Sequence, residues 1–442
     1  MGDENHPRGR ALWERAGQVI PGGVNSATRL IGRPYAFVRA EGAHVWDADG
    51  NRYVDYHAAF GAILLGHRDP GIDAAAAAGT AQIDLMGLGV TEQEVLLAET
   101  LREVMPSAEM TVSCMSGSEA TAQAARLARG VTGRRYLVKV QGGFHGSYDP
   151  YARNVISPAE RAYKLDPLSA GILPDSLAAT LVAEYNDLAS VETFFHAFPD
   201  QIAAVILEPI PHNVGALLPQ PGYLEGLRAI TEREGALLVF DEVITGFRHA
   251  LGGYQQIACV TPDLTTFGKA MANGYPIAGL GGRRALMESF SSAGGPVLLA
   301  GTYNGHPVGT AAALATIDRL RHSDHYARVR RLGDRMRAGL AEAVAELEIP
   351  AQVVGEGSVF VVYFVPAGTP VRGYRDLLRN DDDAYREFHR RMTDKGFLML
   401  PMALKRNHIS GAHTEDDVDR TVEAARAVLA GMRADGFFKD KE

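Results

Sequence analysis

The hydrophobic pattern changes character along the chain. Residues 5–20 carry apolar side chains at helical spacing, and the pattern stops at a Pro-Gly-Gly sequence. Residues 43–56 (AHVWDADGNRYVDY) then alternate apolar and polar around Asp49-Gly50, which predicts a β-hairpin. From about Pro70 to Leu320, short apolar runs alternate with helical stretches. That rhythm is typical of a mostly parallel sheet with helices on both faces.

Two apolar runs in this region end at an acid. Residues 203–209 (AAVILEP) and 235–243 (GALLVFDEV) are apolar until they reach Glu208 and Asp241, so each predicts a buried strand. Ligands of open α/β sheets collect at the carboxyl ends of the strands. We therefore expect both acids at a binding site.

The pattern changes again after Arg321. A helix and the strand-like residues 351–366 (AQVVGEGSVFVVYFVP) predict a smaller α+β domain, whose last helix begins with a capping box of Thr414 and Asp417. The predicted fold class is α/β, with a large domain and a smaller α+β domain formed by the N- and C-terminal segments. The expected boundaries are 1–69 for an N-terminal segment that is part of the small domain, 70–320 for the large domain and 321–442 for the C-terminal domain.

One segment of the large domain fits neither pattern. Residues 149–174 have weak periodicity and four prolines. A lid over the site and an ordinary surface loop both fit this composition, and the lid is slightly favoured.

Composition and charge narrow the function. A net charge of -9 and a pI near 5.9, without a basic cluster, argue against nucleic-acid binding. No secretory signal or bilayer-length apolar run is visible, so we expect a cytoplasmic protein without membrane contact. Cys114 and Cys259 are too few for a disulfide framework and are expected to be buried, and scattered histidines predict no metal site.

One lysine stands out as a chemical group. The chain has only seven lysines, and Lys269 follows a glycine in DLTTFGKAMANG, residues 263–274. Burial and neighbouring cations would lower the pKa of its amine and allow it to form a Schiff base. A P-loop is excluded because the required first glycine would fall on Asp263 and no Ser or Thr follows the lysine. The sequence also lacks a nucleophile elbow and a dinucleotide fingerprint.

Two further features make this lysine informative. Ser116-Gly117-Ser118 begins a predicted helix that ends at Gly130, and such a helix start is either a seat for phosphate or a simple N-cap. Asp241, at the end of an apolar strand, needs a cationic partner, either a salt bridge or a protonated pyridine nitrogen. Phosphate seat, buried acid and amine match the three handles of pyridoxal 5′-phosphate.

At this point the chain resembles a known family. The motifs that carry the resemblance are PGGVNSATR, WDADGNRYVDY, LGHRDP, SGSEATAQAARLARG, GGFHG, EPIPHNVG, DEVITGFR, LTTFGKAMANGYPIAGLGGR and GTYNGHP, between about Pro21 and Leu429. They resemble the class III, fold type I pyridoxal-phosphate aminotransferases, and within these the glutamate-1-semialdehyde 2,1-aminomutases and their transaminase relatives.

The resemblance implies a role for each matching residue. Lys269 would form the Schiff base with the cofactor, and Asp241 would hold the pyridinium proton. Other cofactor contacts would come from Ser116, Gly117, Ser118, Phe144 and Val243 on the two ring faces, Asn213 at the ring hydroxyl, Glu208 as a brace, and Thr302 reaching in from a second subunit of a homodimer. For His145 and His306, structural hydrogen bonding is favoured over catalysis.

The substrate depends on one departure from the mutases. Residues 400–414 contain no acid, and in an ungapped alignment Lys405 stands where the mutases have a glutamate that receives an amine. A lysine in that place would repel the substrate amine that the glutamate receives. Two such like charges about 4 Å apart at an effective dielectric near 20 repel by about 4 kcal/mol. Arg29, Lys405 and Arg406 are either carboxylate anchors or solvated surface residues, with the two interpretations evenly weighted.

We therefore expect an aminotransferase that moves an amino group from an amino acid or similar donor to a keto acid in a ping-pong reaction through pyridoxamine phosphate. The alternative is a glutamate-1-semialdehyde 2,1-aminomutase. A protein that binds the cofactor as a sensor, without turnover, is a third possibility that the intact Lys269 and Asp241 argue against.

Overall fold

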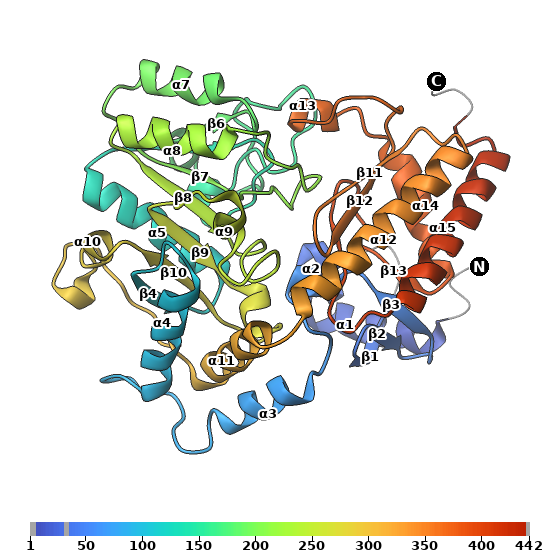
Figure 1. The fold of residues 1–442 in the computed structure, drawn as a ribbon, viewed down its shortest axis with the longest axis horizontal. Helices are drawn as coiled ribbons and strands as arrows, with labels where there is room; N and C mark the ends of the chain where they lie inside the picture. Colours follow the sequence, from blue (N-terminus) through green and yellow to red (C-terminus); the bar gives the residue numbers. More distant parts are fainter. Residues whose placement is uncertain (1–5, 31–34, 439–442) are drawn as a thin grey trace.

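A computed structural model describes residues 6–30 and 35–438 of the chain. Figure 1 shows two lobes, a larger one built around a central sheet and a smaller one that carries both ends of the chain. The first predicted helix is present as α1 (Pro7–Val19), while Asn5, its expected first residue, lies outside the described residues.

The larger lobe contains a seven-stranded sheet in the order β4-β10-β9-β8-β7-β5-β6. Only β10 runs antiparallel to its neighbours, so the prediction of a mostly parallel sheet is confirmed. The strands are β4 (Met110–Cys114), β5 (Tyr136–Val140), β6 (Thr180–Ala183), β7 (Ile202–Leu207), β8 (Leu237–Glu242), β9 (Leu264–Phe267) and β10 (Ala278–Gly282).

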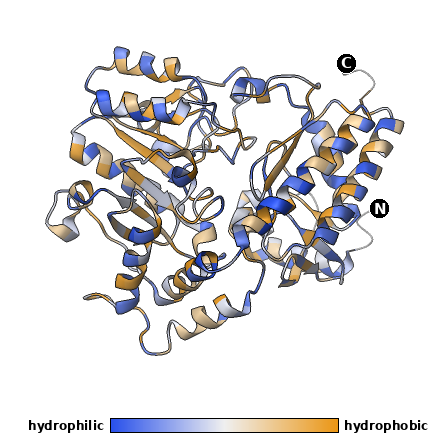
Figure 2. Ribbon diagram, viewed as in Figure 1, coloured by the Kyte–Doolittle hydropathy of each residue, from blue (hydrophilic) through white to orange (hydrophobic). Residues whose placement is uncertain are grey.

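Helices cover both faces of this sheet, which explains the continuous apolar runs in its central strands. Along β7, Val205 packs in the cluster that includes Leu227 of α8, while Ile206 packs in the cluster that includes Leu127 of α5. In Figure 2 the central strands are hydrophobic, and the outer helices are amphipathic, with hydrophobic and hydrophilic residues alternating along them. The principal helices of this lobe are α3 (Pro70–Ala78), α4 (Glu92–Val104), α5 (Gly117–Thr132), α7 (Leu188–Ala197), α8 (Tyr223–Arg233) and α11 (Pro307–Arg321).

Helix α5 extends two residues beyond its expected end at Gly130. It stops at Thr132 because Gly133 takes the left-handed conformation, with φ of 68°, that closes many helices. A glycine inside a helix is a weak stop signal when the surrounding residues pack well.

The smaller lobe joins the two ends of the chain. Strand β13 pairs in parallel with β3, so the N-terminal hairpin and the C-terminal segment share one sheet, β1-β2-β3-β13. The predicted hairpin is confirmed by the antiparallel pairing of β2 with β3. The division at residues 69 and 320 stays a prediction. The elements here are β1 (Phe37–Glu41), β2 (His44–Asp47), β3 (Arg52–Asp55), α12 (His325–Glu346), β11 (Gln352–Val354), β12 (Val359–Tyr363), α14 (Asp382–Asp394), β13 (Phe397–Leu398), β14 (Asn407–His408) and α15 (Glu415–Ala434).

Residues 149–174 are anchored to the larger lobe and to the segment before α14. The buried Arg153 guanidinium donates to the carbonyls of Leu177 and Thr180, and the Tyr374 hydroxyl donates to Ser157 O at 2.7 Å. None of these residues lines the cavity described below. The geometry favours a fixed surface loop over a lid.

The two cysteines differ. Cys114 is buried as expected, but Cys259 is exposed, so that prediction was wrong. Cys259 follows the short helix α9 (Tyr254–Ala258) in a left-handed turn, with φ of 54°, at the surface. Within residues 6–30 and 35–438, no helix combines the length and apolar character needed to cross a bilayer.

The capping boxes provide a test of the fold. Thr414 at the start of α15 accepts from Asp417 N, and Asp417 accepts in return from Thr414 N. We expect Thr414→Ala to lower the free energy of unfolding by about 1 kcal/mol, measured as a fall in Tm. Thr193→Ala, on the exposed side of α7, is the control; equal Tm values for the two variants would contradict the role of the cap.

Candidate active site

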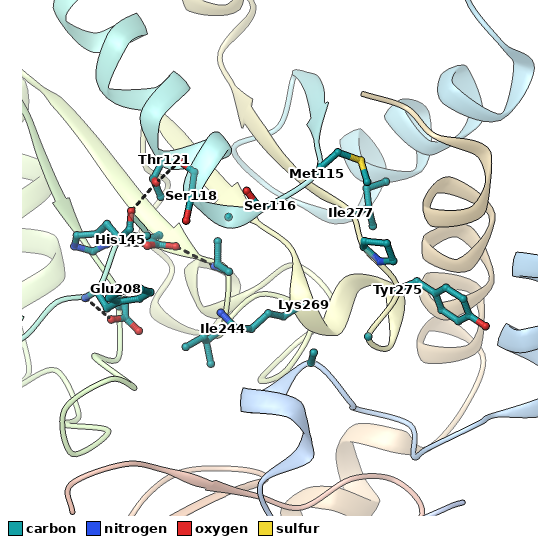
Figure 3. A pocket seen from close by; sticks show the side chains of 18 residues that line it. Met115, Ser116, Ser118, Thr121, His145, Glu208, Ile244, Lys269, Tyr275 and Ile277 are labelled. Atoms are coloured by element: carbon teal, nitrogen blue, oxygen red, sulfur yellow. Dashed lines mark hydrogen bonds and ion pairs between the residues drawn. The ribbon is translucent and has the colours of Figure 1, made fainter. Parts of the chain in front are cut away.

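The carboxyl edge of the large sheet surrounds a cavity of about 280 Å³ (Figure 3). Its walls come from the turn between β4 and α5, the loop after β5, and the ends of β7, β8 and β9. The residues predicted from the strand ends therefore meet in one place, as expected for a doubly covered sheet.

The start of α5 forms one end of the cavity. Ser116 is its N-cap, and its Oγ accepts from Glu119 N at 3.3 Å. A Cβ on Gly117 would lie 2.9 Å from Val243 Cγ1, so a larger residue would have to displace that side chain. Capping and phosphate binding are therefore compatible here, because the helix start still lines the cavity and favours an anion.

Asp241 also lines the cavity and is 3% exposed. Its Oδ2 lies 2.7 Å from His145 Nδ1, and its Oδ1 accepts from Thr266 Oγ1 at 3.0 Å and Val243 N at 3.2 Å. Burial lowers the pKa of His145 despite the neighbouring carboxylate, so the imidazole is neutral near pH 7. Within the described residues no Lys or Arg forms an ion pair with Asp241. This carboxylate is free to neutralise a cation bound in the cavity.

Thr266 is a site residue that the sequence prediction missed. Strands β8 and β9 pair so that Asp241 stands opposite Thr266. The threonine run in residues 263–274 was visible, but only the strand register shows which threonine hydroxyl faces the acid.

Lys269 also lines the cavity (Figure 3). It follows Gly268 immediately after β9 and has a φ of 43°, a left-handed conformation that is uncommon for a residue with a side chain. Burial, and next the charge of Arg406, lower the pKa of its amine to about 8. A larger fraction of the amine is therefore neutral and nucleophilic at physiological pH than for an ordinary lysine.

Glu208 holds the backbone of Phe144, an aromatic residue that lines the cavity. Its carboxylate accepts from Phe144 N at 3.3 Å and from His212 N at 3.2 Å. Burial, followed by repulsion from Asp241, raises the pKa of Glu208 to about 7. Phe144 lines the cavity and is 42% exposed.

These groups fit pyridoxal 5′-phosphate in their chemistry. Helix-start amides suit its phosphate, the carboxylate of Asp241 suits a protonated ring nitrogen, and the amine of Lys269 suits its aldehyde. Phe144 and Val243 supply apolar surface for a flat ring. Neutral His145 leaves Asp241 without a competing full positive charge.

Asn213 and Lys405 lie outside the cavity lining and bind each other. Lys405 Nζ donates to Asn213 O at 2.7 Å and to Asn213 Oδ1, while Asn213 Nδ2 donates to Gly142 O at 3.1 Å. Lys405 is only 7% exposed, so the solvated-surface interpretation is wrong for it. Sequence alone could not show this, because the burial comes from the larger lobe.

Arg406 is also buried, at 4% exposure, so its surface interpretation is wrong too. Its Nη2 donates to Phe60 O at 2.9 Å, and Arg248 from the larger lobe donates to Gly61 O at 2.5 Å. These carbonyls belong to the short turn α2 (Ala58–Gly61), in which Ala58, Ala59 and Phe60 all have φ between 46° and 58°. Two buried arginines therefore hold a left-handed turn beside the cavity.

Three other predicted residues lie elsewhere. Arg29 is exposed and lines a separate cavity of about 640 Å³ in the smaller lobe. Thr302 is exposed, and neither it nor His306 lines the first cavity. His306 caps α11, with Nδ1 accepting from Val308 N at 3.3 Å, which agrees with a structural role.

One group in the described part of the chain has the spacing of a metal site. Ligand atoms of His6, Asp47 and Asp49 lie within 4.8 Å of one another. Both carboxylates already accept backbone N–H groups, Asp49 from Arg8 and Asp47 from Asn51. This geometry is explained by the start of α1 and the adjoining hairpin turn.

Comparison with known proteins agrees with the site. The model for the family "Aminotransferase class-III" matches residues 28–410. The chain is 42% identical over 424 residues, 96% of each chain, to a glutamate-1-semialdehyde 2,1-aminomutase of Methanothrix thermoacetophila. Among solved structures, it is similar to an omega-transaminase from Sphaerobacter thermophilus, with a TM-score of 0.90 and 32% identity, covering 98% and 100% of the two chains. It is also similar to a glutamate-1-semialdehyde aminomutase from Pseudomonas aeruginosa in complex with PMP, with a TM-score of 0.87 and 25% identity over 97% and 95% of the chains.

Fold and site define a pyridoxal-phosphate enzyme of fold type I. More narrowly, the chain belongs to the class III aminotransferase family, and its cofactor is pyridoxal 5′-phosphate. The names of the sequence relatives support the aminomutase better than the expected transfer between two molecules.

The amine of Lys269 should show its lowered pKa when cofactor-free protein is mixed with excess pyridoxal 5′-phosphate. Because only the neutral amine attacks, we expect the loading rate to rise with pH to half its maximum near pH 8 and then level off. Arg406→Gln should move this midpoint to higher pH, since Arg406 lowers the pKa. The reference is Nα-acetyl-lysine, whose midpoint lies at about pH 10.4; a protein midpoint at that pH would contradict the burial of the amine.

Replacing the reacting groups should stop turnover. We expect Lys269→Ala to lower kcat by at least about a thousandfold, since it loses both nucleophile and proton carrier, and Asp241→Asn to lower kcat by about a hundredfold or more. Lys164→Ala removes an exposed lysine and is the control. Turnover within tenfold of the unmodified protein in either site variant would refute its role.

Proposed function

We propose that the chain moves an amino group within or between small substrates that carry a carboxylate. The observation that carries the proposal is the convergence of Lys269, Asp241 and the start of α5 on one cavity, next to a buried arginine. Bound pyridoxal 5′-phosphate supplies an aldehyde that condenses with amines and a ring that withdraws electrons. The protein groups orient that chemistry and move its protons.

Lys269 has two tasks in this proposal. Its amine would hold the cofactor by its aldehyde, and once a substrate amine has taken that place, the freed Nζ would carry the proton that leaves the substrate carbon. The carboxylate of Asp241 would stabilise the positive charge of a protonated ring nitrogen. Thr266 and His145 hold the two carboxylate oxygens in place. Glu208 holds the backbone of Phe144 against the cavity.

The buried cations indicate the substrate class. Arg406 and Lys405 are both at most 7% exposed, and residues 400–414 contain no acid. Arg406 Nε has no hydrogen-bond partner among the described residues. A buried guanidinium with an unused donor suits a carboxylate, which it binds in a planar geometry. We infer that Arg406 anchors the substrate carboxylate, with exposed Arg29 as a weaker candidate.

The first candidate activity is that of a glutamate-1-semialdehyde 2,1-aminomutase. Its support is the likeness to the named relatives, at 42% identity over nearly the whole length. The reaction keeps the amino group within one molecule and needs no separate acceptor. The substrate carries one carboxylate, which Arg406 would bind.

The second candidate is amino-group transfer from a donor to a separate keto acid. Its support is Lys405, which is buried beside Asn213 where the resembled mutases have a glutamate. Burial, followed by the charge of Arg406, lowers the pKa of Lys405 to about 7, and its protonated form disfavours a substrate with two amines and favours one with carboxylates. Similarity to the omega-transaminase structure is compatible with it.

We also propose a homodimer with shared sites and a cytoplasmic location. Two segments carry exposed apolar side chains. One, next to Thr302 in the sequence, contains Leu298 and Tyr303, and the other, just before α4, contains Met86, Leu88 and Val90. Covering them with a second copy would remove apolar surface from water and bring Thr302 to a neighbouring site.

One experiment separates the two candidates. Purified, cofactor-loaded protein is incubated with glutamate-1-semialdehyde alone, and separately with α-, β- and ω-amino donors plus pyruvate or 2-oxoglutarate. An aminomutase forms 5-aminolevulinate without an acceptor at a rate at least about a hundredfold above any donor pair. The opposite ranking establishes transfer between molecules. Lys405→Glu should then raise the semialdehyde rate, whereas Lys405→Gln, the matched neutral control, should raise it less; no turnover in any assay would refute the proposal.

A further inference from the structure

Lys139 is a buried amine that the chemistry above does not use; burial, followed by the charge of Arg153, lowers its pKa to about 7. It lies in β5 between apolar residues and is 0% exposed. It does not line the cavity, and no ion pair is seen for it within the described ranges. A buried ammonium is costly unless its donors are satisfied, so its presence in an otherwise apolar strand requires an explanation.

The ammonium binds three backbone carbonyls. Nζ donates to Gly143 O at 2.7 Å, Tyr151 O at 3.2 Å and Arg153 O at 2.7 Å. A lysine ammonium has three N–H donors, so this arrangement uses all of them. The three acceptors come from both ends of the loop that follows β5, residues 141–153, and one cation therefore closes the loop on itself.

This loop carries the partner of Asp241. Gly143 O is two residues before His145, whose Nδ1 lies 2.7 Å from Asp241 Oδ2. Tyr151, held by the same ammonium, packs its ring edge-on against the His145 ring with centroids 5.5 Å apart. Lys139 therefore fixes the chain before the imidazole and the aromatic ring beside it.

The loop is also tied at other points: Phe144 N donates to Glu208, Ser147 N donates to Ser118 Oγ at 3.1 Å, and Asn213 Nδ2 donates to Gly142 O. Gly142 and Gly146 flank His145, with φ of 89° and 84°, in a conformation that glycine adopts freely. At His145 itself, the Thr121 hydroxyl donates to the carbonyl oxygen at 2.7 Å. Without the ammonium, three buried carbonyls would have to find other partners, and the loop would shift.

We propose that Lys139 is a positioning residue, which sets the place of His145 against Asp241 and so the grip of that carboxylate on the protonated ring nitrogen of the cofactor. It acts through the loop and touches neither cofactor nor substrate. The proposal rests on the cofactor and not on either candidate substrate.

The test compares Lys139→Met, which fills similar volume without donors, with Lys395→Met at an exposed position. In the loaded protein, a poorly placed Asp241 lets the ring lose its proton, the ring withdraws fewer electrons, and the imine nitrogen stays protonated to higher pH. The midpoint of the pH-dependent absorbance change should rise by at least about half a pH unit in Lys139→Met. It should stay unchanged in Lys395→Met.

A second readout uses cofactor-free protein. The proton between His145 and Asp241 should give a downfield NMR signal that is absent in His145→Gln and is shifted or lost in Lys139→Met. In the His145→Gln background, Lys139→Met should add no further change to the absorbance midpoint, since both act through one contact. These readouts need no amino substrate, so their failure is distinct from failure of the proposed function.

A purely structural lysine would give a different result. Lys139→Met would then lower Tm and leave both the absorbance midpoint and the downfield signal unchanged, which overturns the proposal. If Lys139→Met does not fold, Lys139→Gln, which keeps two donors, and Tyr151→Leu, which removes the ring contact, should each shift the midpoint in the same direction; unchanged midpoints in these variants also overturn it.

Discussion

The site depends on a buried carboxylate, that of Asp241, with which no Lys or Arg of the described residues forms an ion pair. Moving a carboxylate from water into a protein interior costs several kcal/mol unless hydrogen bonds or a counter-charge replace its hydration. Around Asp241 the protein provides hydrogen bonds from Thr266 and Val243 N and a neutral imidazole. An arginine in that position would stabilise the apoprotein and compete with a protonated ring. The carboxylate of Asp241 therefore lacks a cationic partner at the position where the protonated ring of the cofactor would bind.

The two lobes supply opposite charges to this region. The larger lobe contributes Asp241 and Glu208 from its strand ends, and the smaller lobe contributes Lys405 and Arg406 from the segment before β14. Their influence meets at Lys269, where burial lowers the pKa most, Arg406 lowers it further and the two carboxylates raise it. Acid–base behaviour at the reacting amine is therefore a property of the packed lobes together.

The parts of this arrangement that rest on local pattern were predictable from the sequence. Strands β7 and β8 are buried on both faces, so their runs are apolar and the acids at their ends stand out. The amine of Lys269 was conspicuous for another reason, because the chain has only seven lysines and this one follows a glycine after two threonines. Family resemblance then supplied roles that no pattern contains.

What was not predictable depends on register and on contacts between distant segments. Thr266 became a partner of Asp241 only through the pairing of β8 with β9. The burial of Lys405 comes from a contact with Asn213, 192 positions earlier in the chain. The prediction for Cys259 was wrong in the opposite direction: it was expected to be buried, but the left-handed turn after α9 places it at the surface. Side-chain type alone does not report such long-range neighbours.

The left-handed turn at Ala58, Ala59 and Phe60 has a mechanical consequence. Each such residue costs roughly 1–2 kcal/mol relative to ordinary backbone, and the turn is held by Arg248 from one lobe and Arg406 from the other. A hinge motion that separated the lobes would withdraw at least one of these arginines and let the turn relax. Separation of the lobes would therefore release the backbone strain in the turn. If Arg406 were the arginine withdrawn, the same motion would also change the electrostatics at the amine of Lys269.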